Sequence, residues 1–166
     1  MSTEPAANIV RTEDYLGRFP DKGRFFELKE YGLKFFMVKD CFCSGPSGQI
    51  IAPINDRLDQ SAILDESFNY DHDENAVATA MQLALQEGLA TVTLDEAAPL
   101  FPIWGLHNFW HWLFNCLPKV LLLESLGFKG QYIVNRNNDY TLGTLALAGI
   151  DDSRVLHCDR KFVIRN

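Results

Sequence analysis

The chain has 166 residues, of which 47% are hydrophobic and 22% charged, with a formal net charge of -7. This length is typical of one compact domain, and the composition excludes a largely disordered chain. The acidic balance argues against a nucleic-acid binder or a polybasic membrane-surface protein, since both need basic surfaces. Residues 1–8 lack a secretory signal, and no apolar run is long enough to span a bilayer. We therefore expect a soluble, cytoplasmic protein.

In chain order, residues 1–12 are small and polar and predict a disordered N-terminus. Residues 13–33 mix aromatic and charged side chains, a pattern compatible with a short helix and a strand. Strands are predicted at 33–42 and 49–54, separated by a turn rich in glycine and proline. We expect residues 13–70 to form a β-rich leading segment with a small antiparallel unit.

The next elements have helical periodicity. Residues 74–89 predict a helix and 91–94 a short strand, and Pro99 is expected to break the structure that follows. Residues 107–126 predict one long, very apolar helix that Pro118 should kink or divide, because proline removes a hydrogen bond and clashes with the preceding turn.

The remainder alternates strands and helices. Gly127 should end the long helix, and a strand at 131–134 precedes a helix that Gly149 closes and a strand at 154–158. This order is typical of a parallel α/β sheet. We therefore expect residues 71–166 to form a Rossmann-like α/β domain, a parallel sheet with flanking helices.

The four cysteines show neither a disulfide framework nor the paired ligand sets of a structural zinc site. Cys41 and Cys43 form one Cys-x-Cys, while Cys116 and Cys158 stand alone in apolar surroundings. Because cysteine is among the most often buried residues, we expect buried, reduced thiols.

A polar row on the apolar helix is the most informative pattern. Asn108, His111, Asn115 and Lys119 are spaced by three, four and four residues, so they should share one face. A buried helix with one polar line favours a position beside a cleft, although the same residues would also suit a solvent-facing edge.

Two patterns resemble metal-ligand pairs, but the residues around them do not favour metal binding. His107 and His111 have the spacing of a helical metal pair, but Asn108 stands where a zincin has its glutamate. Asp71 and Asp73 resemble an Asp-x-Asp cation motif, yet acidic residues also favour the start of the helix that follows. We expect no metal site, and a metal-dependent hydrolase is a distant alternative.

The loop 135–138 follows a strand and precedes a helix, where parallel sheets bind ligands. Arg136 there would suit a phosphate or carboxylate, and Asn135 would line the same edge. A plain solvated turn is the alternative.

Residues 108–119 read NFWHWLFNCLPK and resemble the N-x-x-H-W-x-x-x-x-L-P-[KR] signature of glycosyltransferase family 61. That family includes bacterial capsular-polysaccharide-type enzymes and eukaryotic protein-glycan and xylan transferases. The resemblance covers about residues 42–166 and implies the N-terminal half of a GT-B-like architecture. It further implies transfer of a sugar from a nucleotide-sugar donor to a glycan hydroxyl in polysaccharide biosynthesis, with no other cofactor.

The resemblance places the motif histidine at His111 and its neighbours at Trp112 and Asn108. His111 is the candidate catalytic base, but we favour a substrate-contacting or structural role for it. Trp112, Asn115 and Lys119 are the further candidate substrate-binding residues, together with Asn135 and Arg136.

Family members continue into a donor-binding domain where this chain ends at Asn166. We therefore expect this polypeptide alone to transfer no sugar and to need a C-terminal domain or an oligomeric partner. The alternative is a non-catalytic Rossmann-like binding or interaction module.

Overall fold

The computed structural model describes residues 8–29, 33–44, 50–54, 57–64, 91–100, 108–135, 139–158 and 163–165. The helix predicted at 74–89 and the turn predicted between the first two strands lie outside these residues. Among the described residues, no helix is long and apolar enough to cross a membrane.

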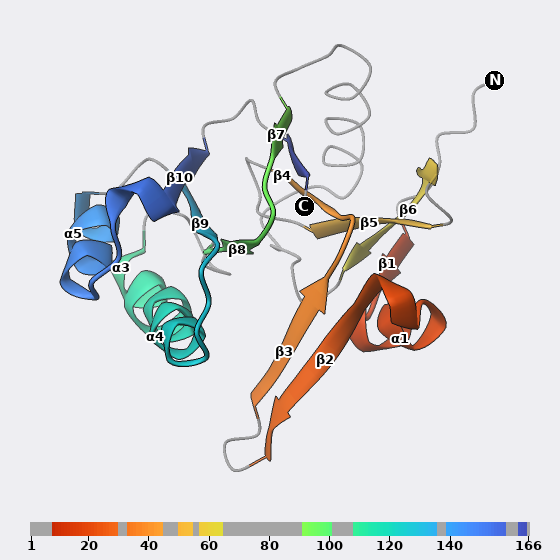
Figure 1. Cartoon of the computed structure of the whole chain (residues 1–166), viewed down its shortest axis with the longest axis horizontal. Coiled ribbons are helices and arrows are strands. Elements are labelled where there is room, and N and C mark those ends of the chain that lie inside the picture. Colours follow the sequence, from red (N-terminus) through yellow and green to blue (C-terminus); the bar gives the residue numbers. More distant parts are fainter. Residues whose placement is uncertain are drawn as a thin grey trace.

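A mixed six-stranded sheet takes its strands from both ends of the chain (Figure 1). Its strands, in spatial order, are β1 (Asn8–Val10), β6 (Arg57–Leu64), β5 (Ile50–Ile54), β4 (Phe42–Ser44), β11 (Val163–Arg165) and β7 (Thr91–Thr93). Strands β4, β5 and β6 pair antiparallel, as the sequence predicts for the leading segment. Strand β11 lies antiparallel to β4 and parallel to β7, so the sheet extends beyond residues 13–70.

The strand predicted at 33–42 is divided in two. Strand β3 (Leu33–Val38) pairs with β2 (Gly23–Leu28) in a separate antiparallel hairpin, whereas β4 belongs to the six-stranded sheet. Between them Asp40 adopts a φ of 51°, in the left-handed region that interrupts an extended strand. The expected helix within 13–33 is α1 (Thr12–Arg18), and it precedes β2.

Helix α1 contributes to the first core. Tyr15 and Leu16 on this helix pack with Val38, Cys41 and residues of β5 and β6. Tyr15 is fully buried, and its ring also contacts Phe19 at 5.1 Å between centroids. This core joins the helix, the end of the hairpin and the six-stranded sheet.

A second, three-stranded sheet is wholly parallel and has the order β10-β9-β8. Its strands are β8 (Ala97–Pro99), β9 (Gln131–Asn135) and β10 (Val155–Cys158). The strands predicted near 131 and 154 are confirmed, but β8 was not predicted. Pro99 is tolerated there because it ends an edge strand, where a missing backbone N–H costs little.

Helices connect these parallel strands. The predicted long helix runs through α3 (Phe109–His111), a π-helical turn (Trp112–Cys116) and α4 (Leu117–Ser125), while α5 (Asp139–Leu147) joins β9 to β10. The widened turn directly precedes Pro118, and the Leu117 amide donates to the Trp112 carbonyl five residues back. The predicted disturbance at the proline is thus a π turn, a feature frequent at functional sites.

Glycines end both helices, as predicted. Gly127 and Gly149 adopt φ values of 82° and 80°, which side chains other than glycine rarely allow. After each helix the next amide reaches back to the last turn, from Phe128 to Leu123 and from Ile150 to Leu145, in the Schellman pattern.

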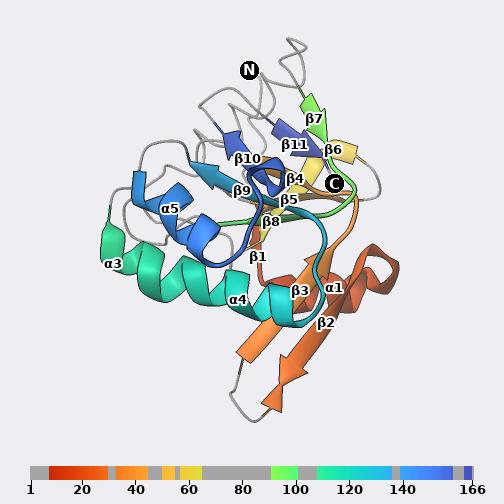
Figure 2. The same cartoon turned by 60° about the vertical axis from the view of Figure 1, so that its left-hand side comes forward.

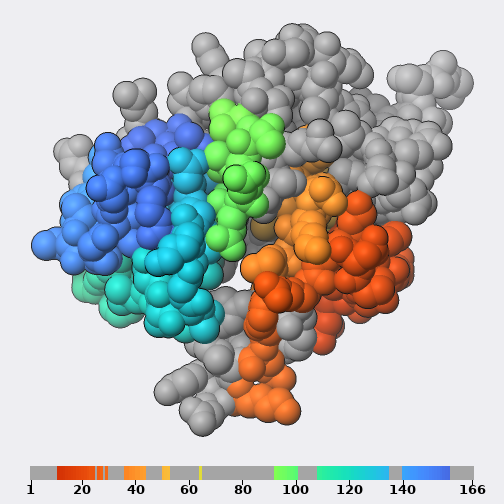
Figure 3. Space-filling model, in the orientation of Figure 1, coloured from red at the N-terminus to blue at the C-terminus, as the bar shows by residue number. Residues whose placement is uncertain are grey.

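Both helices cover one face of the parallel sheet (Figure 2). Trp112, Cys116 and Val120 of the long helix and Leu145 of α5 pack on this face, where Tyr132 of β9 is fully buried. The opposite face turns towards the six-stranded sheet, since Ile133 packs against Cys43 of β4. Segment 91–100 supplies one strand to each sheet and lies between the two coloured halves in Figure 3.

The parallel sheet with helical crossovers agrees with the expected strand and helix order, whereas a larger Rossmann-like or GT-B-like domain stays a prediction. Cys41, Cys43 and Cys116 are free, buried thiols, as expected from the sequence. Burial raises the pKa of both Cys41 and Cys116 to about 11, so these thiols stay protonated at neutral pH.

Candidate functional site

The polar row begins at the start of the long helix. Asn108 is the N-cap residue, and its Oδ1 accepts a hydrogen bond of 3.0 Å from the Trp110 amide. This bond satisfies one of the free amides of the first turn. Asn108 therefore fixes where the helix starts, and its side chain is exposed at that end.

His111 and Asn115 are brought together across the π turn. Asn115 Nδ2 lies 3.2 Å from His111 Nδ1, and both residues are partly exposed. This contact holds the imidazole ring in one orientation, and Nε2 is the ring nitrogen left to contact a ligand. Lys119, one turn further along on α4, is exposed.

Trp112 lies in the core and not on the polar face. It is only 3% exposed, and its Nε1 donates a 2.7 Å hydrogen bond to Thr144 Oγ1 on α5. The sequence suggested that Trp112 contacts a substrate, but its ring is enclosed by the packing of the helices against β9. The structure gives this tryptophan the role of joining the long helix to α5.

Sequence reasoning missed two aromatic residues beside the polar pair. Trp110 and Phe114 are 63% and 64% exposed, and their rings stack with 5.7 Å between centroids and 7° between planes. A spacing of four residues places them one turn apart, a signal present in the sequence. The motif resemblance assigned substrate binding to their neighbour Trp112 instead.

The first turns of α3 and α5 meet at the carboxyl edge of the parallel sheet. The Phe109 ring contacts the Tyr140 ring edge-on, with 5.2 Å between centroids and 81° between planes. Asn135 is the last residue of β9, so the predicted loop leaves the sheet at this same edge. Arg136 and the side chain of Asn135 lie outside the described parts of the structure.

This edge carries two unsatisfied polar atoms. Within the described residues, the hydroxyl of Tyr140 and Nδ1 of His157 are buried and have no hydrogen-bond partner. Burial also raises the pKa of Tyr140. Since buried polar groups are nearly always paired, such atoms indicate a place where a water or a ligand group would be accommodated.

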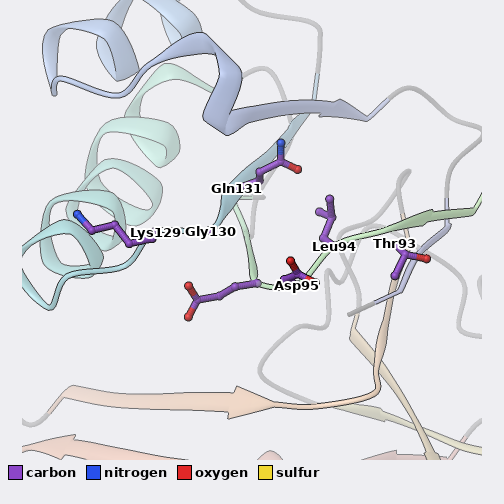
Figure 4. A pocket seen from close by; sticks show the side chains of 7 residues that line it. Thr93, Leu94, Asp95, Lys129, Gly130 and Gln131 are labelled. Atoms are coloured by element: carbon purple, nitrogen blue, oxygen red, sulfur yellow. The ribbon is translucent and has the colours of Figure 1, made fainter.

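A pocket of about 400 Å³ lies at the opposite, amino edge of the sheet (Figure 4). Its lining residues are Thr93, Leu94, Asp95, Glu96, Lys129, Gly130 and Gln131. None of the residues predicted for substrate binding contributes to it. Parallel sheets bind ligands at their carboxyl edge, which here is the edge with His111 and Asn135.

A charged network joins α4 to the start of β9 and to Arg154, the residue before β10. Arg154 forms two hydrogen bonds with the Glu124 carboxylate, of 2.8 and 3.0 Å, and Tyr132 donates a third of 2.7 Å. The Arg154 guanidinium also donates to the Gly130 and Phe128 carbonyls. The hydrogen bond from Arg154 lowers the pKa of Glu124, with burial opposing the effect. The network fixes α4 to β9 and β10.

The described part of the chain holds no group of three His, Cys, Asp or Glu side chains arranged to bind a metal. His107 and the pair Asp71 and Asp73 lie outside that part. The metal hypothesis is therefore neither supported nor tested by these residues.

No protein-family model matches the chain, and no curated protein or solved structure shows significant similarity to it. The resemblance to glycosyltransferase family 61 accordingly rests on residues 108–119 and the element order around them.

Proposed function

We propose that this chain is the N-terminal, acceptor-side part of a glycosyltransferase related to family 61. It would contribute to the transfer of a sugar from a nucleotide-sugar donor to a glycan hydroxyl in cytoplasmic polysaccharide synthesis. The observation that carries the proposal is the hydrogen-bonded pair of His111 and Asn115 on a partly exposed π turn. The motif resemblance selects His111, whereas Asn115 falls on an unspecified position of the motif.

The pair supports a contact between His111 and a bound substrate. With Nδ1 next to Asn115, Nε2 is the ring nitrogen left to contact an oxygen atom of a bound sugar or phosphate. His111 would thus orient a substrate oxygen, and Asn115 would hold the imidazole ring in place.

The carboxyl edge offers further support. The unpaired hydroxyl of Tyr140 and Nδ1 of His157 lie in the elements that border this edge. Asn135 ends β9 at the same edge, and Lys119 adds an exposed cation on the helix. A substrate with several oxygen atoms would find donors and acceptors there.

A non-catalytic interaction module is the second candidate. Several large apolar side chains on the two helices are exposed, among them Leu121 at 54%, Leu126 at 59% and Leu147 at 89%. Exposed apolar surface on helices is typical of protein interfaces. In this case the helices would bind another protein, and His111 would have a structural role in its helix without contacting a substrate.

The test is genetic and chemical. The gene is deleted in the source organism, and the monosaccharide composition and linkages of its polysaccharides are measured. We expect one glycan to lose a sugar residue, complementation with the unaltered gene to restore it, and complementation with His111→Ala to fail. Expression and thermal unfolding of the variant protein establish that it still folds.

Asn115→Ala should weaken restoration less than His111→Ala, because it removes only the group that orients the imidazole. Unchanged glycans after deletion would contradict the proposed function. Full restoration by folded His111→Ala would remove His111 from the site while leaving the sugar-transfer proposal standing.

A further inference from the structure

Trp110 and Phe114 form an exposed pair of stacked rings, the aromatic platform, on the long helix. Their rings are nearly parallel, and about two-thirds of each residue is exposed. Aromatic side chains contribute most to stability when they are buried. Two stacked rings that stay open to solvent on successive turns are therefore not required for folding.

The platform is held in place from beneath. The Trp110 ring contacts Phe109 at 6.1 Å between centroids, and Phe109 in turn packs edge-on against Tyr140 of α5. The Asn108 cap fixes the first turn from which Trp110 projects. A ligand that uses these rings would meet a surface that is already ordered, which lowers the entropic cost of binding.

Two hydrogen-bonding side chains lie next to the two rings. Along a helix, positions 110, 111, 114 and 115 form two adjacent rows, so the aromatic pair borders the pair of His111 and Asn115. One surface thus combines two aromatic rings with Nε2 of His111 and the amide of Asn115. This combination is more specific than an apolar row alone.

We infer that Trp110 and Phe114 bind a pyranose ring of the acceptor glycan. One face of many pyranoses is lined with C–H groups, whose slight positive charge suits the negative face of an aromatic ring. The hydroxyl groups at the sugar's rim would then lie beside His111 and Asn115. This inference rests on the proposed function and deepens it, since it names the class of ligand and the residues that orient it.

A partner helix would use this surface differently. Helix docking requires apolar positions repeated along the helix, and here it would extend from Trp110 and Phe114 to the exposed Leu121. A single pyranose needs only the two stacked rings and their polar neighbours. Leu121 therefore distinguishes a sugar from a second copy of the chain or another helix.

The experiment titrates the folded protein with methyl β-D-galactopyranoside and methyl β-D-glucopyranoside and follows the indole and backbone N–H signals by NMR, so that the backbone amides of residues 108–115 report binding in the variants that lack the Trp110 indole. The Trp110 signal is identified by its absence in Trp110→Phe. We expect this signal to shift on addition of at least one sugar. Trp110→Ala and Phe114→Ala should each weaken binding about tenfold, whereas Trp110→Phe, which keeps a flat ring, should stay within about threefold.

Two matched controls remove exposed leucines at other places. Leu121→Ala lies on the same helix, and Leu147→Ala is on α5. Both should leave sugar binding unchanged. Two results together would overturn the inference in favour of self-association. Leu121→Ala would weaken sugar binding as much as Trp110→Ala does, and the molecular mass measured by light scattering would fall to the monomer value in Trp110→Ala.

Absence of binding by both sugars, or binding that Trp110→Ala does not weaken, would also overturn the inference. Neither result bears on the deletion experiment, which tests sugar transfer independently of these methyl glycosides. Glycans that are unchanged by deletion, together with sugar binding at Trp110, would reject the transferase and retain the sugar-binding platform.

Discussion

The indole of Trp112 shows how one buried polar contact joins two helices. Its Nε1 donates to Thr144 Oγ1 at 2.7 Å, and the same hydroxyl donates to the Tyr140 carbonyl, also at 2.7 Å. The threonine hydroxyl therefore accepts a hydrogen bond from the long helix and donates one within α5. Loss of this oxygen would leave the buried indole N–H without an acceptor.

We expect Thr144→Val to lower the free energy of unfolding by about 1–3 kcal/mol, the cost of an unsatisfied buried donor. Urea unfolding followed by circular dichroism measures the change. Thr144→Ser is the matched control, because it keeps the hydroxyl, and it should lose less than half as much. Equal stability of the valine and serine variants would show that the hydrogen bond contributes nothing.

Part of the candidate site was predictable from single residues. The helical spacing correctly brought His111 and Asn115 together, since residues four apart meet on most helices. Helical spacing also places Trp112 with Cys116 and Val120 on one face, and all three are buried in the core. The predicted substrate contact of Trp112 came from the motif resemblance and not from this spacing. The π turn was not predictable, because periodicity alone does not show where a turn will take an additional residue.

The contact between Glu124 of α4 and Arg154, the residue before β10, depends on pH. The hydrogen bond from Arg154 holds the folded-state pKa of Glu124 below its ordinary value of 4.5. The carboxylate therefore stabilises the fold at pH values above 4.5, and this contribution is lost as the pH falls through the lower, folded-state pKa.

We expect Glu124→Gln to lose about 1.5–3 kcal/mol of unfolding free energy at a pH of about 7, the range measured for hydrogen bonds to charged groups. The difference from the unaltered protein should shrink as the pH falls through the folded-state pKa of Glu124, because the carboxyl group is then protonated in both the folded and the unfolded state. Urea unfolding at several pH values measures this trend. A difference that grows on acidification would contradict the assigned role of the carboxylate.

Gly130 marks a close approach between two chain segments. A Cβ atom at this position would overlap the carbonyl oxygen of Glu96, which also accepts a hydrogen bond of 3.0 Å from the Gln131 amide. By contrast, a Cβ at Gly143 on α5 would meet no atom within 4 Å. The two glycines therefore make a matched pair for the same substitution.

Gly130→Ala should destabilise the protein by about 1–3 kcal/mol through forced separation of the start of β9 from Glu96. Gly143→Ala should instead stabilise it by about 0.5–1 kcal/mol, because alanine favours the helix interior. Thermal unfolding of both variants measures these opposite effects. A rise in melting temperature for Gly130→Ala would show that the close approach is easily relieved.

The order of strands and helices was largely predictable between residues 107 and 158. Gly127 and Gly149 mark helix ends in the sequence, and the strand at 131–135, which is buried at 132–134, lies between them. Strand β8 escaped prediction because it is short and contains Pro99. Its identity comes from pairing with β9, a tertiary interaction that local sequence does not contain.

Across the whole molecule, β11 joins strands that are distant in the sequence. Ile164 lies opposite Cys43 in β4 and beside Val92 in β7, so β11 occupies an interior position of the six-stranded sheet. The sequence divided the chain near residue 70, whereas this sheet contains strands from both sides of that boundary. Hydrophobic pattern predicts a strand but not its partner, which explains why this pairing was not foreseen.

A proline in β11 should disturb both neighbouring strands. Ile164→Pro removes a backbone donor from an interior strand and should destabilise the protein by about 3 kcal/mol or more, while Ile164→Val keeps this donor and should destabilise the protein much less. Hydrogen exchange measured by mass spectrometry should show faster exchange in β4 and β7 of the proline variant. Unchanged protection of these strands would mean that they are stable without β11.

The interior position of β11 also constrains the order in which the protein is built during synthesis. The parallel unit contains strands and helices that follow one another closely, so it can form soon after residue 158 leaves the ribosome. The six-stranded sheet must wait for residues 163–165, although four of its strands are made within the first 64 residues. Until then β4 and β7 each have an open edge, which makes the nascent chain vulnerable to aggregation at that stage.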